Sequence, residues 1–247
     1  MRSIGWGTFI IMGKNDTENN KEWLVLAVDT TTPTGSVALL RNTELIAEFN
    51  QDSSTTFSER LLPAVQFILK SSGMVIKDID GFAVAVGPGS FTGIRIGLST
   101  IKSFAYASGK PVAPVSTLMA LAMKLLPSCR LICTLIDAKK KEIYAALFES
   151  RRGRLEEIIP QGAYSPDMFF SRLPTHRIIH FIGSGKDVFR TTLRDYFGDK
   201  ARFSKRSPHI AFEVGLIGID LLKNKKGKEF QEIEPLYLRK SQAEEKH

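Results

Sequence analysis

The first half of the chain alternates between unbroken apolar runs and runs with helical spacing. WLVLAVD, from residue 23, and GFAVAVG, from residue 81, are continuous apolar segments, which is typical of parallel strands buried on both faces. Two further strands and two amphipathic helices are predicted at residues 36–40, 44–50, 58–70 and 94–107. The predicted order is therefore three strands, a helix, a strand and a second helix.

The second half repeats this plan. It predicts strands at 131–137, 142–148, 155–159 and 177–183, and helices at 165–173 and from the following GSG turn to about 196. Each half opens with a strand that ends in an aspartate, Asp29 or Asp137. Two mixed-sheet subdomains flanked by helices predict an α/β duplicated fold. We expect a disordered extension over residues 1–22, one subdomain over 23–115, and a second with a C-terminal tail over 116–247.

This duplicated pattern is similar to that of the actin-like ATPase superfamily, in which strand-end acids position magnesium and the hairpin turns hold phosphates. The similarity implies a vestigial nucleotide site formed by Asp29, Asp137, Gly183 and Gly185. We expect it to bind nucleotide weakly and without hydrolysis, because the first turn, TTPTG, carries no lysine or arginine. The alternative is that each aspartate only begins a turn.

The composition is that of a globular protein with a sizeable core. Hydrophobic residues make up 43% and charged residues 24% of the 247 residues. No apolar run reaches the roughly 18 residues of a membrane span, and no signal-peptide cleavage site precedes residue 23, so we expect a cytoplasmic protein with no membrane contact. Cys129 and Cys133 are expected to be buried free thiols. The net charge of +8 suits an acidic partner such as RNA, although the basic clusters are small and spread along the chain.

The most informative segment begins at Gly87 and reads GPGSFTGIRIGLSTIKSFAYASGKPVAPVSTL. Its glycines allow a sharp turn before a helix N-terminus, a place that suits an anion, but no Gly-Lys-Ser/Thr closes a P-loop. The segment closely resembles GPGSFTGLRIG, the signature of the TsaB (YeaZ) family. LAVDTTTPTGSVALL, SERLLP, LIDAKKKEIYAALF and EPLYLRKSQAE resemble further motifs of that family, in the same order. The resemblance covers residues 23–244.

This resemblance implies an actin-like (ASKHA) fold and a role in tRNA modification. TsaB proteins are paralogues of TsaD, the subunit that transfers a threonylcarbamoyl group to the adenosine next to the anticodon of tRNAs reading codons that begin with A. The family implies a heterodimer with TsaD, joined by the ATPase TsaE, and tRNA bound through that complex. A homodimer is the alternative assembly where TsaD is absent.

The resemblance also implies that this chain is not the catalyst. TsaD-type subunits bind a metal through a His-x-x-x-His helix, and by register Thr117 and Leu121 stand at those positions. A leucine has no lone pair to donate. His176 and His180 have the same spacing, but they lie in a predicted strand, where about 13 Å would separate them. We expect no catalytic residue, no metal and no cofactor.

The two helices of the first half are the expected partner interface. Each carries apolar or small residues on more than one side, although one buried stripe is enough to cover a sheet. The expected interface residues are Leu62, Leu69, Gly93, Gly97, Thr100, Phe104 and Ala107. The alternative is that the two helices only pack on each other. Two other functions stay open here: an enzyme in its own right, such as an ATPase, carbamoyl transferase or peptidase, and a stand-alone RNA-binding module.

Overall fold

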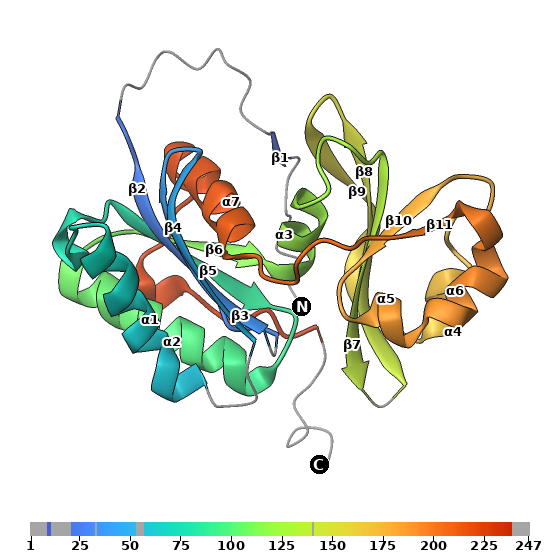
Figure 1. Cartoon of the computed structure of the whole chain (residues 1–247), viewed down its shortest axis with the longest axis horizontal. Helices are drawn as coiled ribbons and strands as arrows, with labels where there is room; N and C mark the ends of the chain where they lie inside the picture. Colours follow the sequence, from blue (N-terminus) through green and yellow to red (C-terminus); the bar gives the residue numbers. More distant parts are fainter. Residues whose placement is uncertain (1–8, 11–20, 33, 53–56, 140, 239–247) are drawn as a thin grey trace. The chain divides into compact units, whose positions relative to one another are not determined.

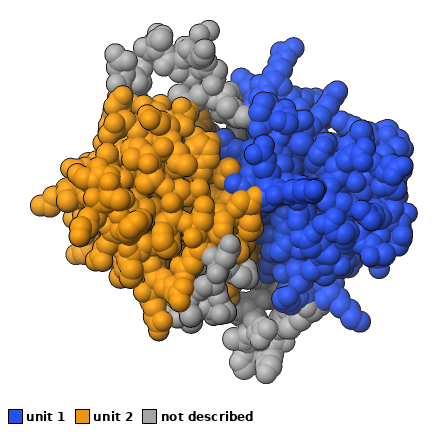
Figure 2. Space-filling model, viewed as in Figure 1, with its two compact units in different colours: residues 1–17, 121–206 blue, residues 18–120, 207–247 orange. Residues whose placement is uncertain are grey.

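A computed structural model gives the fold and divides the chain into two compact units, which Figure 2 colours. It describes residues 9–10, 21–32, 34–52, 57–139 and 141–238. The first unit (orange) comprises residues 18–120 and 207–247, and the second unit (blue) comprises residues 1–17 and 121–206. Each unit is built on one mixed sheet.

The sheet of the first unit combines an antiparallel meander with two parallel strands. Its strands are β2 (Leu24–Asp29), β3 (Thr34–Arg41), β4 (Glu44–Asp52), β5 (Gly81–Gly87) and β6 (Val112–Ser116), in the order β4-β3-β2-β5-β6. β2 pairs antiparallel with β3 and parallel with β5. Every residue of β2 and β5 is buried, as their unbroken apolar runs predict.

Helices cover both faces of this sheet (Figure 1). Helices α1 (Phe57–Ser71) and α2 (Phe91–Ser108) lie on one face, and α7 (Ala211–Lys223) lies on the other, against β2, β3, β5 and β6. Gly215 and Gly218 bring α7 close, since a Cβ on Gly218 would stand 2.4 Å from the Cβ of Ala83.

The division into units therefore differs from the predicted boundary between residues 115 and 116. Residues 207–247, which the sequence predicts for the second subdomain, belong to the first unit. The physical reason is that a sheet whose central strands are apolar on both faces needs a cover on each. Most of the second unit is the single segment 121–206, which the chain inserts between the two segments of the first unit.

The sheet of the second unit repeats the first. Its strands are β7 (Leu131–Lys139), β8 (Glu142–Arg151), β9 (Arg154–Tyr164), β10 (Ile179–Ile182) and β11 (Ala201–Phe203), with β1 (Phe9–Ile10) beside β9. The remaining helices are α3 (Thr117–Met123), α4 (Pro166–Phe170), α5 (Gly185–Val188) and α6 (Arg190–Phe197), with 3-10 turns at Ile76–Asp78, Gly198–Lys200 and Phe230–Glu232. The order β9-β8-β7-β10-β11 matches β4-β3-β2-β5-β6 strand for strand, which confirms the predicted duplicated α/β fold.

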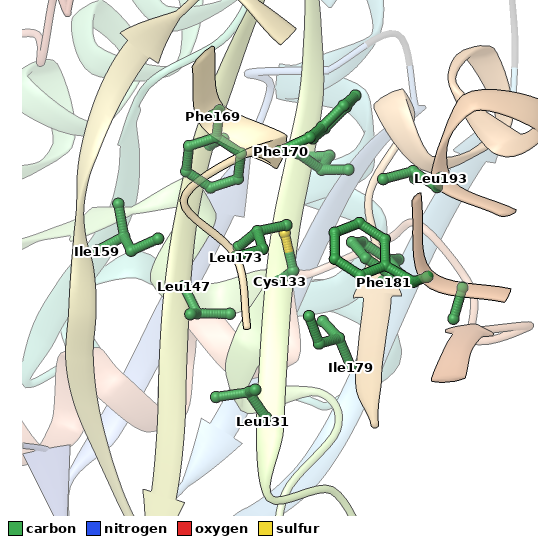
Figure 3. Packing of buried hydrophobic residues seen from close by; sticks show 14 of the residues in the cluster. Leu131, Cys133, Leu147, Ile159, Phe169, Phe170, Leu173, Ile179, Phe181 and Leu193 are labelled. Atoms are coloured by element: carbon green, nitrogen blue, oxygen red, sulfur yellow. The ribbon is translucent and has the colours of Figure 1, made fainter. Parts of the chain in front are cut away.

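An aromatic cluster fills the core of the second unit (Figure 3). Phe169 and Phe170 from α4 pack near Phe181 of β10 and Leu193 of α6. Cys133 of β7 lies among them, fully buried. Both cysteines are free and buried, which confirms the expectation from the sequence.

Most of the extension expected over residues 1–22 lies outside the described residues. Phe9–Ile10 form β1 and pair antiparallel with Leu155 and Arg154 of β9. Within the described part of the chain, no helix has the length and apolar character needed to cross a membrane.

Candidate functional site

The Gly-rich turn between β5 and α2 packs directly onto the turn that follows β2. A Cβ on Gly89 would stand 2.1 Å from the carbonyl oxygen of Thr31, and a Cβ on Gly93 would stand 1.9 Å from that of Thr30. A Cβ on Gly97, one helical turn further on, would stand 2.4 Å from Oγ1 of Thr30. Side chains do not fit at these distances, so the close contact of the two backbones requires all three glycines.

Hydrogen bonds hold the same contact. The Ser90 N–H donates to the Thr31 carbonyl oxygen at 2.6 Å, and the Thr30 hydroxyl donates to the Gly93 carbonyl oxygen at 2.7 Å. The Ser90 hydroxyl caps α2 by accepting from the Gly93 N–H at 3.2 Å. The N–H groups of Ser90 and Gly93 are therefore bonded within the protein, and this turn packs the start of α2 against Thr30 and Thr31.

Asp29 lies at the end of β2, beneath this contact, and is fully buried. Its Oδ1 accepts from the Thr31 N–H at 2.9 Å and from the Thr31 hydroxyl at 2.6 Å, and that hydroxyl accepts in turn from Thr117 at 3.0 Å. Oδ2 has no hydrogen-bond partner among the described residues. Burial raises the pKa of Asp29 from 3.8 to about 6, against the opposing effects of the Thr31 hydrogen bonds and the charge of His209.

The space beside Asp29 is too small for a nucleotide. A cavity of about 10 Å³ adjoins it, lined by residues of the first unit alone; a single water needs roughly that much room. Asp29, which the sequence predicts for a nucleotide site, is thus buried beside a cavity that residues of its own unit line. Thr117, at the register of a TsaD-type histidine, is also buried and bonded to Thr31.

Asp137, the corresponding residue of the second unit, is only half-buried. Lys139 engages both of its oxygens, with its N–H at 2.9 Å from Oδ1 and its Nζ at 2.8 Å from Oδ2. Burial opposes the charged form of Asp137, but the hydrogen bonds and charge of Lys139 outweigh it and hold its pKa below the ordinary value.

The GSG turn of the second unit packs on β7 as the Gly-rich turn of the first unit packs after β2. A Cβ on Gly183, whose φ is +100°, would stand 2.2 Å from the Leu135 carbonyl oxygen. A Cβ on Gly185 would stand 3.0 Å from Cβ of Leu135. The Ser184 hydroxyl accepts from the Asp137 N–H at 3.3 Å. Of the four predicted nucleotide-site residues, the structure thus gathers three in one unit and encloses Asp29 in the other.

The sequence predicts no metal in this chain, and the titratable side chains of its described part are spread out. No group of three or more histidine, cysteine, aspartate or glutamate side chains there could hold a metal ion. His180 lies in β10 and His176 lies in the turn before it. Leu121, at the register of the second TsaD-type histidine, is buried.

An apolar groove of about 460 Å³ runs between α1 and α2 on the first unit. It is lined by Leu61, Leu62, Phe91, Thr92, Arg95, Ile96, Ser99 and Thr100. Leu62 is 47% exposed and Phe91 is 40% exposed, and Phe67 on α1 is 63% exposed. The Arg95 guanidinium lies 3.8 Å from the centre of the Phe91 ring, whose other neighbour is the ring of Tyr237. Exposed rings and aliphatic side chains between two helices are typical of a protein-binding surface.

Only some of the predicted interface residues lie at this groove between the two predicted helices. Leu62 and Thr100 line the groove, and Ala107 is exposed at the end of α2. Leu69, Gly93 and Gly97 are buried inside the first unit, and Phe104 is half-buried and stacks on Phe82. The small-residue stripe on α2 serves the contact with Thr30, whereas sequence reasoning assigned it to a partner helix.

Phe91, Arg95, Ile96 and Ser99 were missed as groove residues. Ile96 and Ser99 have the helical spacing of Thr92, so all three share one face of α2. That pattern was visible in the sequence. Nothing in the sequence showed that this face is the outward one.

Comparisons with known proteins agree with this picture. Residues 49–247 match the family described as "TsaD: tRNA N6-adenosine threonylcarbamoyltransferase". The chain is 31% identical over 225 residues to the "tRNA threonylcarbamoyladenosine biosynthesis protein TsaB" of Bacillus subtilis, covering 90% of this chain and 96% of that protein. The chain belongs to the TsaB family. The TsaB protein of Haemophilus influenzae is 30% identical, over 87% of this chain and 93% of its own length.

A solved structure of a TsaB-family protein shares the fold. YeaZ from Pseudomonas aeruginosa superposes with a TM-score of 0.75 at 25% identity, covering 87% of this chain and all of the other. The fold and the family expected from the GPGSFTG signature are therefore confirmed. Membership of the TsaB family places this chain in the biosynthesis of threonylcarbamoyladenosine in tRNA.

The close contact at Gly97 predicts that an alanine there destabilises the protein, whereas glycine-to-alanine changes in exposed helices stabilise. In an exposed helix, Gly→Ala stabilises by about 1 kcal/mol. Here we expect Gly97→Ala to lower the free energy of unfolding by about 1–2 kcal/mol, because over-packing costs typically 1–3 kcal/mol. Ser99→Ala, on the exposed side of the same helix, is the control and should not destabilise. Urea denaturation measures both, and a stabilised Gly97→Ala variant would contradict the contact.

The burial of Asp29 makes a prediction about pH. Because the folded-state pKa is raised to about 6, the neutral carboxyl favours the folded state, and this contribution is present below pH 3.8 and lost as the pH rises through 6. Asp29→Asn removes the titration. Relative to Asp29→Asn, we expect the wild type to lose up to roughly 3 kcal/mol of stability between pH 4 and 6.5.

The measurement is urea denaturation of both proteins at several pH values across this window. The difference between the two curves isolates Asp29 from the other carboxyl groups. Parallel curves would show that Asp29 titrates normally and is not enclosed as the structure has it.

Proposed function

We propose that this chain is a non-catalytic partner subunit that acts beside a TsaD-type transferase, with the ATPase TsaE, in threonylcarbamoylation of the adenosine next to the anticodon of tRNAs reading codons that begin with A. Family membership supports the pathway, because relatives across most of the chain are tRNA threonylcarbamoyladenosine biosynthesis proteins. The internal bonding of Asp29 and of the Gly-rich turn supports a role other than catalysis. In an actin-like ATPase, the carboxylate at the position of Asp29 would serve the nucleotide site, whereas here it is bonded to Thr31.

The groove between α1 and α2 is the observation that carries the proposal. It exposes large apolar side chains on a unit that has already filled its own core. A shallow space between two helices accepts the ridge of a third, and a stable interface of this kind buries on the order of 1,200–2,000 Å² in total. A TsaD-type partner, as a paralogue with the same duplicated plan, has an equivalent helix pair to place there.

A second copy of this chain could occupy the same groove where TsaD is absent. Both assemblies would then compete for the same residues, so the TsaD-type partner should displace the homodimer. Weak nucleotide binding by the second unit, around Asp137 and Gly183, stays a prediction that calorimetry with ATP and magnesium would test.

The test of the interface is Leu62→Glu. Leu62 is half-exposed, so the isolated variant should fold as the wild type does. In a complex the glutamate would be buried without a partner, which costs several kcal/mol, and we expect affinity for the TsaD-type subunit to fall at least a hundredfold. Threonylcarbamoylation reconstituted with TsaD, TsaE and the adenylate-forming enzyme should fall with it.

Val188→Glu is the matched control. Val188 is 60% exposed on the second unit, so the substitution introduces the same charge on an aliphatic position away from the groove. It should leave affinity and tRNA modification at the wild-type level. Wild-type binding by a folded Leu62→Glu variant would exclude the groove, and full modification without this chain would exclude the partner role itself.

A further inference from the structure

The positive charge of the chain belongs to the second unit. Residues 121–206 hold 17 of the 34 lysine and arginine residues but 9 of the 26 acidic residues, so this segment accounts for the whole net charge of +8. The rest of the chain is balanced. The basic clusters are spread along the sequence, and one of them lies in the first unit, but acidic residues balance the cations outside residues 121–206.

The strand directions gather many of these cations at one end of the second sheet. β7, β10 and β11 run parallel and begin at this end, and the β8–β9 turn lies there too. The cations contributed there are Arg130, Arg151, Arg152, Arg154, Arg177 and Lys200. We call this set the arginine edge. From β9 to β11 it spans four strand spacings, or roughly 19 Å.

One buried carboxylate holds three of these guanidinium groups. Glu149, whose side chain is 3% exposed, lies 2.5 Å from Arg177, 2.6 Å from Arg151 and 3.5 Å from Arg130. The hydrogen bond from Arg177, followed by that from Arg151, holds the pKa of Glu149 below its ordinary value. Three cations around one anion leave a surplus of two positive charges, in fixed positions.

The β8–β9 turn carries three arginines at positions where strand pairing and turn geometry favour other residues. Arg151 lies directly opposite Arg154, and like charges in that position destabilise a sheet. Arg152 between them has a φ of +52°, a conformation that favours glycine or asparagine. Glu156, 3.6 Å from Arg151, and Asp199 offset only part of the charge. Violations of this kind are typical of functional surfaces.

We propose that the arginine edge binds the phosphate backbone of RNA. Guanidinium groups bind phosphate oxygens in pairs, and a row of them along one end of a sheet suits a polymer with regularly spaced charges. The headgroups of a membrane surface are mobile, so binding to them does not depend on how the arginines are spaced. The choice of tRNA as that RNA rests on the proposed function. The chain would then hold its protein partner through the first unit and tRNA through the second.

The experiment measures binding of bulk tRNA to the purified full chain alone, as a function of salt. The variant Arg130→Gln/Arg152→Gln/Arg154→Gln removes three cations and leaves Arg151 and Arg177 to cover Glu149. We expect at least a tenfold loss of affinity at about 0.1 M salt, and a fall of about 2–3 in the slope of log K against log salt. Arg152→Gln alone, in an exposed turn, should give about one third of the slope change.

The matched control is Lys77→Gln/Lys225→Gln/Lys226→Gln, which makes the same change of net charge on exposed positions of the first unit. It should bind tRNA within twofold of the wild type. Wild-type binding by the arginine variants, or an equal loss in the lysine control, would overturn the proposal. So would arginine-dependent binding to phosphatidylglycerol vesicles without binding to tRNA. TsaD is absent from this assay, so its outcome is independent of the Leu62→Glu test.

Discussion

Thr30 and Thr31 lie in close contact with the Gly-rich turn and the start of α2, and this approach depends on glycine at positions 89, 93 and 97. The contact fixes where α2 lies on the sheet and encloses Asp29 at the end of β2. It also bonds the N–H of Ser90 inside the protein. Because the face of α2 that carries Gly93 and Gly97 packs on Thr30, its other face points to α1 and to solvent. That face lines the groove.

The second unit uses the same construction with a different result. Gly183 packs on the carbonyl oxygen of Leu135 as Gly89 packs on that of Thr31, but Asp137 stays partly exposed and binds Lys139. The two units therefore share the geometry of this turn, while the side chains around it differ in chemistry. The first unit displays apolar side chains, and the second carries the positive charge.

Local patterns predicted much of this structure. The apolar runs of β2 and β5 fixed the central strands, the repeated order indicated duplication, and the GPGSFTG segment identified the family. The placement of α7 was not predictable from local patterns. Residues 121–206 separate α7 in the sequence from the sheet whose second face it covers. The role of Gly97 was misjudged because spacing along a helix shows which residues share a face but not which face points inward. The arginine edge could be recognised only from the directions of the strands, since its residues lie in four separate segments of the sequence.

The proposed function requires the first unit to bind a partner through α1 and α2 rather than a nucleotide through Asp29. Hydrogen–deuterium exchange of the full chain, alone and with its TsaD-type subunit, distinguishes the two. We expect new protection over residues 57–71 and 91–108 on complex formation, with exchange at Thr30 and Thr31 already slow in the free chain. Unchanged exchange in α1 and α2, with protection on complex formation confined to the second unit, would contradict it.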